Sequence, residues 1–216
     1  MKKIFPVLLL TLFCFSCKQT AEKFYNAGIK KMHTLPESSN GKPSQAAVEA
    51  QLRAAINDFS EAIKLDSNCL KAYENRLSIR QALDDYAGSL ADAEKLATLE
   101  PKSASVHYAV GRSKDDLKDY AGAIVAFGKA IALDPKNAEY YSARAHSEES
   151  LDEDDAALKD YDQSIIISPS GRYSRFVYYA RGVLKHTMND NSGCLIDLQK
   201  AKSLGDQNTQ ADVVCK

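Results

Sequence analysis

The sequence contains no tryptophan, only four histidines and no excess of either charge. With 28 basic and 29 acidic residues its formal net charge is −1, which excludes the strongly basic surface expected of a nucleic-acid-binding protein. No motif joins the histidines, and no cysteine or histidine pair has the spacing of a zinc site. A glycine-rich phosphate loop and a G-x-S-x-G nucleophile elbow are also missing. We therefore expect no catalytic residues, no metal and no cofactor.

A repeat of 34 residues is the main feature that is present. The triplets Leu99-Glu100-Pro101, Leu133-Asp134-Pro135 and Ile167-Ser168-Pro169 follow one another at this spacing. The chain is 44% apolar and 26% charged, a composition that excludes disorder for most of it. A fixed period of this length predicts stacked supersecondary units that bury their apolar faces against their neighbours.

Each unit has the pattern of a helical hairpin. Helical spacing of apolar residues is interrupted by a short polar turn and ends before a proline. The predicted helices cover residues 70–83, 86–99, 104–117, 120–133, 138–151 and 154–167, with a fifth pair between 175 and 204 that ends at Gly205. The first unit begins near Ala21 and is 15 residues longer than the others. We expect an exposed loop at 33–42 and a lengthened second helix starting at Pro43 or Ser44.

Small residues recur at facing positions of the two helices. They are Gly28, Leu77, Gly111, Ala145 and Gly182 on first helices and Ala55, Ser89, Ala123, Ala157 and Cys194 on second helices. Aromatic residues, such as Tyr73 and Phe127, recur beside them. This combination of period, small residues, aromatic residues and proline resembles the tetratricopeptide repeat family between Ala21 and Gly205. The departures are Leu77 where glycine is usual, and Ser67 and Asp206 where proline is usual.

The resemblance implies an all-α, right-handed superhelical solenoid of about five hairpins. The repeats would cover about 21–69, 70–103, 104–137, 138–171 and 175–208, followed by a short capping helix at 209–216. It also implies a concave groove, formed by first helices, that binds a protein or peptide. The expected lining is Tyr25, Ile29, Glu74, Asn75, Ser78, Tyr108, Arg112, Ser142, His146, Glu149, Tyr179, Val183 and His186. Alternatively, the tyrosines of this set pack between adjacent hairpins.

Charged residues of the two helices occur together. Where the first helix carries arginine, the second carries aspartate 16 residues later, in the pairs Arg76 and Asp92, Arg144 and Asp160, and Arg181 and Asp197. The third unit lacks both charges, with Val110 and Ala126 at these positions. This covariation predicts partly buried ion pairs that fix the register of each hairpin. Asp58 is an exception because Ala27 stands at the arginine position.

The N-terminus has the pattern of a targeting segment. Lys2 and Lys3 precede an apolar stretch that ends before Ser16 and Cys17, and the chain then turns polar. We interpret 1–16 as a signal peptide and 17–20 as a tether. The residues before Cys17 resemble a bacterial lipoprotein cleavage site, which implies an acylated Cys17 and a location in the cell envelope, on the periplasmic side of the outer membrane. An ordinary secretory leader is the alternative.

Three further cysteines, Cys69, Cys194 and Cys215, would remain in the mature chain. Cys194 belongs to the last hairpin and Cys215 to the segment that closes the chain, so we expect a disulfide between them. Two buried free thiols are the alternative. Taken together, the sequence predicts a non-catalytic interaction scaffold or assembly factor that is held at a membrane by its lipid. A small-molecule or glycan-binding envelope lipoprotein is the alternative function.

Overall fold

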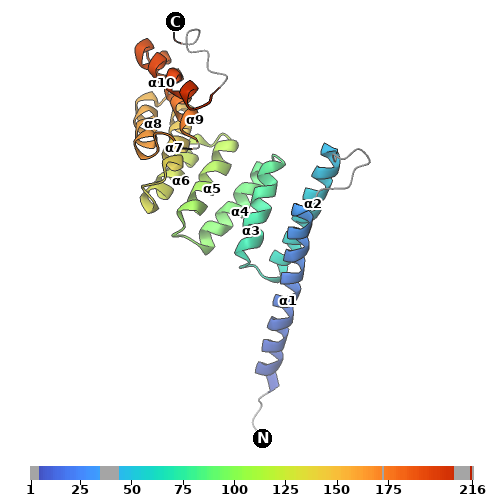
Figure 1. The fold of residues 1–216 in the computed structure, drawn as a ribbon. Helices are drawn as coiled ribbons and strands as arrows, with labels where there is room; N and C mark the ends of the chain where they lie inside the picture. The colour runs from blue at the N-terminus through green and yellow to red at the C-terminus, as the bar shows by residue number, and fades with distance from the viewer. Residues whose placement is uncertain (1–4, 35–43, 172, 207–214, 216) are drawn as a thin grey trace. The chain divides into compact units, whose positions relative to one another are not determined.

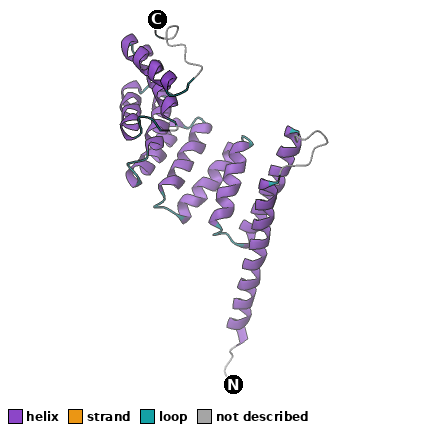
Figure 2. Cartoon of the chain, viewed as in Figure 1, coloured by secondary structure: helices purple, strands orange, loops and turns teal. Residues whose placement is uncertain are grey.

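The computed structural model describes residues 5–34, 44–171, 173–206 and 215, and side chains from residue 18 onward. Throughout these residues the regular structure is helical (Figures 1 and 2). The helices are α1 (Phe5–His33), α2 (Gln45–Leu65), α3 (Leu70–Ala82), α4 (Tyr86–Leu99), α5 (Ala104–Asp116), α6 (Tyr120–Leu133), α7 (Ala138–Glu149), α8 (Asp154–Ile167), α9 (Ser174–Thr187) and α10 (Asn191–Ser203). The predicted all-α class is confirmed.

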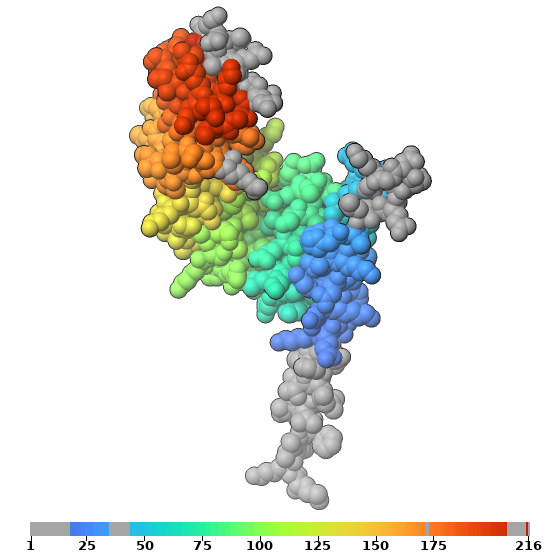
Figure 3. Space-filling model, viewed as in Figure 1, coloured from blue at the N-terminus to red at the C-terminus, as the bar shows by residue number. Residues whose placement is uncertain are grey.

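The helices pack as consecutive hairpins within two compact units, Met1–Glu100 and Pro101–Lys216. In the first unit α1 packs on α2 and α3 on α4, and the space-filling view shows the described atoms of this unit as one continuous surface (Figure 3). In the second unit α5 packs on α6, α7 on α8, and α9 on α10. From α3 to α10 the helix ends lie within two residues of the positions predicted from the sequence.

The first helix is longer than the sequence pattern indicates. α1 is continuous from Phe5 to His33, so the predicted leader, the tether and the first repeat helix form one element. None of the helices in the described part of the chain is both long and apolar enough to cross a membrane. The lengthened second helix is present as α2, and the Ser44 side chain caps it by accepting a hydrogen bond from the Ala47 amide. Most of the predicted loop at 33–42 and of the predicted cap at 209–216 lies outside the described residues.

The turn inside each hairpin has a recurrent geometry. One residue adopts a positive φ of 57° to 64°, at Asp84, Lys118, Asp152 and Asn189. In three hairpins the next residue is an aspartate whose carboxylate accepts the amide hydrogen of a glycine three residues on, at Gly88, Gly122 and Gly193. A Cβ atom on these glycines would lie 2.0 to 2.3 Å from the capping carboxylate. The α7–α8 hairpin has Glu153 and Ala156 instead, and Glu153 makes no side-chain cap bond.

Large and small residues are matched across each hairpin, which explains the departure at Leu77. A Cβ atom at Gly28 would meet the Phe59 ring at 2.8 Å, and one at Gly111 would meet the Phe127 ring at 2.5 Å, so a large residue of the second helix covers a glycine of the first. In the α3–α4 hairpin the same two positions hold Leu77 and Ala93, both buried. The two sizes are therefore exchanged between the helices, and the core volume is retained.

Candidate functional site

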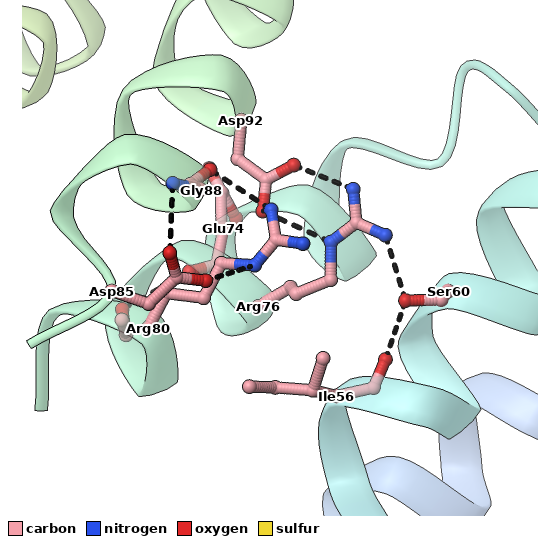
Figure 4. A network of polar contacts seen from close by, with 9 residues as sticks. Ile56, Ser60, Glu74, Arg76, Arg80, Asp85, Gly88 and Asp92 are labelled. Atoms are coloured by element: carbon pink, nitrogen blue, oxygen red, sulfur yellow. Dashed lines mark hydrogen bonds and ion pairs between the residues drawn. The ribbon is translucent and has the colours of Figure 1, made fainter. Parts of the chain in front are cut away.

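A buried ion-pair network closes the α3–α4 hairpin (Figure 4). Arg76 donates from Nε to Asp92 Oδ2 at 2.9 Å and from Nη2 to Oδ1 at 2.6 Å. Its third nitrogen, Nη1, donates to Ser60 Oγ on α2 at 2.8 Å. Arg80, one turn further along α3, adds a second cation at 2.8 Å from Asp92 Oδ2. Asp92 is only 2% exposed, so two guanidinium groups compensate the burial of its charge.

The same arrangement recurs in the second unit at both of the other predicted pairs. Arg181 binds Asp197 through Nε at 2.8 Å and through Nη2 at 2.6 Å, and its Nη1 donates to Asp162 on α8 at 2.6 Å. Arg144 binds Asp160 through Nε at 2.6 Å and Nη2 at 2.9 Å. All three sequence pairs are thus bidentate contacts between the helices of one hairpin.

A second row of residues completes these pairs and was missed from the sequence. Four positions after the arginine position, a basic residue reaches the same aspartate: Lys31 binds Asp58 at 2.7 Å, and Lys185 binds Asp197 at 2.8 Å, as Arg80 does with Asp92. Asp58 is therefore paired, although Ala27 stands at the arginine position. In the third repeat the basic residue, Lys114, binds Asp119 instead. The signal was the spacing of the basic residues along the first helices.

The fourth repeat breaks this row with an acid. Glu148 stands where the other four repeats have lysine or arginine, and it is 7% exposed. Its carboxylate lies 3.6 Å from Arg144 Nε, which Asp160 already occupies at 2.6 Å. Burial, followed by the nearby charge of Asp160, raises the pKa of Glu148 to about 7. One arginine in this hairpin therefore serves two buried carboxylates.

The C-terminal end is held by a disulfide between Cys194 in α10 and Cys215, whose Cα atoms lie 5.8 Å apart. This is the pairing favoured from the sequence. Cys69, the N-cap residue of α3, has a free thiol. Within the described ranges, no three His, Cys, Asp or Glu side chains are grouped as metal ligands. Cys17 lies within α1 in a part whose side chains are not described.

A cavity of about 280 Å³ opens in the second unit. First helices of three successive hairpins supply most of its wall, together with one residue of α8 and the residue before α9. The lining residues are Tyr108, Glu139, Ser142, Ala143, His146, Tyr161, Tyr173, Phe176, Val177 and Ala180. Four of the ten carry aromatic rings. Tyr161 is 2% exposed at the base of the wall, whereas Phe176 is 53% exposed.

Carboxylates hold the cavity tyrosines in place. The Tyr108 hydroxyl donates to Glu139 Oε1 at 2.8 Å, and the Tyr161 hydroxyl donates to Glu149 Oε2 at 2.9 Å. Burial and these carboxylates raise the pKa of both phenols. On the same wall a contact with Asp115 raises the pKa of His146. The wall is therefore apolar over its rings and electronegative at its polar groups.

The predicted groove residues of the second unit fall into two sets. Tyr108, Ser142 and His146 line the cavity, whereas the following five residues lie beside it or away from it. Glu149 contacts it through the Tyr161 hydroxyl, Arg112 interacts with Tyr108, and Tyr179, Val183 and His186 do not line it. The ring expected from Tyr179 is supplied by Phe176, because the three-residue insertion before α9 shifts which side chains face inward.

In the first unit the predicted groove residues are partly packed. Tyr25 stacks on Phe59 with ring centroids 5.8 Å apart, and Asn75 Nδ2 donates to the Tyr25 hydroxyl at 3.4 Å. Ile29 packs against the core cluster of this unit, whereas Glu74 and Ser78 are exposed. Tyr108 in the second unit packs similarly, 5.7 Å from Phe127. Packing between hairpins, the alternative considered from the sequence, therefore describes two of the three tyrosines.

Comparison with known proteins agrees with this geometry. Residues 104–137 match the model of the tetratricopeptide repeat family. Among solved structures, a MamA protein aligns with a TM-score of 0.71 at 19% identity, covering 86% of this chain and 92% of its own. YrrB, a TPR protein with an unusual peptide-binding site, aligns at 0.63 and 18% over 76% of this chain and 83% of its own. PilF of Pseudomonas aeruginosa aligns at 0.69 and 11% over 92% and 82%. No curated protein sequence matches significantly. The chain has a tetratricopeptide-repeat fold.

Proposed function

We propose that the protein is a non-catalytic interaction scaffold that binds a peptide segment of a partner protein in the cavity of its second unit. The observation that carries this proposal is the convergence of α5, α7 and α9 on one open, aromatic-lined cavity. Rings such as Phe176 offer a large contact area at a small cost in side-chain entropy. Proteins with this fold bind protein or peptide partners, and the related YrrB fold is described with a peptide-binding site.

The size of the cavity favours a side chain over a free small molecule. Pockets for drug-sized ligands occupy about 300 to 1,000 Å³, and this cavity of about 280 Å³ lies just below that range. One or two large side chains of an extended or helical segment would fill it. A glycan stacked on the exposed rings is the competing function, and a thermal shift with glycans but with no peptide would favour it.

Site-specific photo-crosslinking in cells tests the proposal. A photoreactive amino acid in place of Phe176 should form one dominant adduct, whereas the same probe in place of Val125, 62% exposed on α6, should not. Ala143→Phe fills the cavity and should abolish the adduct, and Ala121→Phe, at an exposed site of α6, should preserve it. Equal adducts at both probe positions, or an adduct that survives Ala143→Phe, would contradict peptide binding at this site.

We further propose that acylated Cys17 anchors the protein to an envelope membrane, on the periplasmic side of the outer membrane, and that the scaffold assembles its partner there. The support is the basic, apolar and small-residue pattern that precedes Cys17 in the sequence. Stable anchoring requires more than one acyl chain, because a single chain binds with only about 10⁴ M⁻¹. Cys17→Ala should move the protein from the detergent-extracted membrane fraction to the soluble fraction. Unchanged membrane association would exclude this anchor.

A further inference from the structure

We propose that the cavity of the second unit receives a cationic side chain, lysine or arginine, of the bound segment. This inference rests on the proposed peptide binding and specifies its chemistry. The alkyl stem would lie against the aromatic wall, and the cationic head would lie beside the Glu139 carboxylate and the ring faces.

The walls suit a long side chain with an apolar stem. Tyr108, Tyr161, Tyr173 and Phe176 present rings, and Val177 adds an aliphatic surface. Aromatic faces carry negative electrostatic potential and attract ammonium and guanidinium groups within about 6 Å. The chain already contains such a contact at this site, because the Arg175 guanidinium lies 4.5 Å from the centroid of the Phe176 ring.

The charges around the cavity favour a cation. Glu139 lines the wall, and two more carboxylates contact lining side chains directly: Glu149 accepts from Tyr161, and Asp115 accepts from Ser147 and lies 3.4 Å from His146 Nδ1. His146 is the only lining residue that can carry a positive charge.

Two cations lie beside the cavity without lining it. Arg112 interacts with the Tyr108 hydroxyl, and Arg175 covers part of Phe176. Burial and the Glu139 and Glu149 carboxylates raise the pKa of Tyr108 and Tyr161, as expected where the local potential is negative.

Other side chains fit this wall less well. An acidic side chain would approach Glu139 and the ring faces with unfavourable charge. A purely apolar side chain would fill the volume, but it would remove water from the Glu139 carboxylate and give it no partner. A lysine or arginine side chain buries its stem and pairs its head with that carboxylate, so it satisfies both parts of the wall.

Peptide selection followed by single-atom changes tests the inference. A display library of random 12-residue peptides is selected on the full chain, and one selected peptide is synthesised with lysine, norleucine or glutamate at its anchor position. Norleucine retains the alkyl stem and lacks the ammonium group. We expect at least a tenfold loss of affinity for norleucine and a larger loss for glutamate, measured by fluorescence anisotropy. The affinity of the lysine peptide should fall with added salt more steeply than that of the norleucine peptide.

Variants locate the effect. Glu139→Gln should remove most of the difference between the lysine and norleucine peptides, and Glu94→Gln, the same change at an exposed position of α4, should leave it intact. Circular dichroism checks that both variants fold. Equal binding of the lysine and norleucine peptides, or selection of apolar or acidic anchors that Ala143→Phe blocks, would overturn the cationic anchor and leave peptide binding in place. Failure to select any peptide that Ala143→Phe blocks would overturn both proposals.

Discussion

Glu148 is predicted to make the stability of the second unit depend on pH. Its carboxyl group is buried beside Asp160 and shares the single guanidinium of Arg144. Glu148→Gln retains the shape and removes the charge. Glu148→Lys restores the basic residue that Arg80 and Lys185 supply in the equivalent hairpins. Both variants should therefore be more stable than the natural chain wherever Glu148 is ionised.

The size and sign follow from the pKa of Glu148, which rises from 4.5 to about 7 on folding. Below pH 4.5 the group is protonated in both states and contributes no difference. Between pH 4.5 and 7 the native state keeps a proton that the unfolded chain releases, so the free energy of unfolding falls as pH rises. A shift of this size corresponds to about 3 kcal/mol at most. We expect Glu148→Gln to add about 1 to 3 kcal/mol at pH 8 and almost nothing at pH 4.

Urea denaturation of the natural chain and the variants between pH 4 and pH 8 measures this effect. Subtracting the natural curve from the variant curve removes the contribution of every other titrating group. Because a repeat array unfolds in parts, amide hydrogen exchange in α7 and α8 is the second readout. Glu94→Gln, an exposed change in α4, is the matched control. A stability difference that is the same at pH 4 and pH 8 would refute the reasoning.

Three further predictions concern the same elements. Arg144→Met should cost about 1 to 3 kcal/mol because it leaves Asp160 buried without its partner, and a double-mutant cycle of Arg144→Val with Asp160→Ala should show strong coupling. Additive effects would mean that the two side chains do not interact. Gly128→Ser should stabilise by about 1 kcal/mol, since its Cβ would lie 3.7 Å from Arg144 Nη1 where another hairpin has a serine, and better helix propensity adds to the gain. Gly122→Ser in the same helix should destabilise instead, because its Cβ would lie 2.1 Å from Asp119 Oδ2. Non-reducing peptide mapping should find Cys194 joined to Cys215, and reduction should cost roughly 3 kcal/mol for a loop of 21 residues, with α10 losing exchange protection first.

The sequence by itself determined the local elements. A 34-residue period, the turn residues and the prolines placed the ends of α3 to α10 within two residues, because caps and turns are decided by neighbours in the chain. The arginine and aspartate pairs were also readable, since two residues that appear and disappear together at a fixed spacing report a contact within one hairpin. Cys194 and Cys215 were identified by counting cysteines.

Tertiary structure alone decided the features that depend on several repeats together. Leu77 reads as a departure from the pattern until Ala93 is found opposite it, and Glu148 reads as one more surface charge until α8 buries it beside Asp160. The cavity joins side chains of α5, α7, α8 and α9, and Phe176 lines it in place of the predicted Tyr179. The physical reason is that a sequence pattern fixes the face of a helix on which a residue lies, whereas the packing angles and insertions between repeats decide which faces meet.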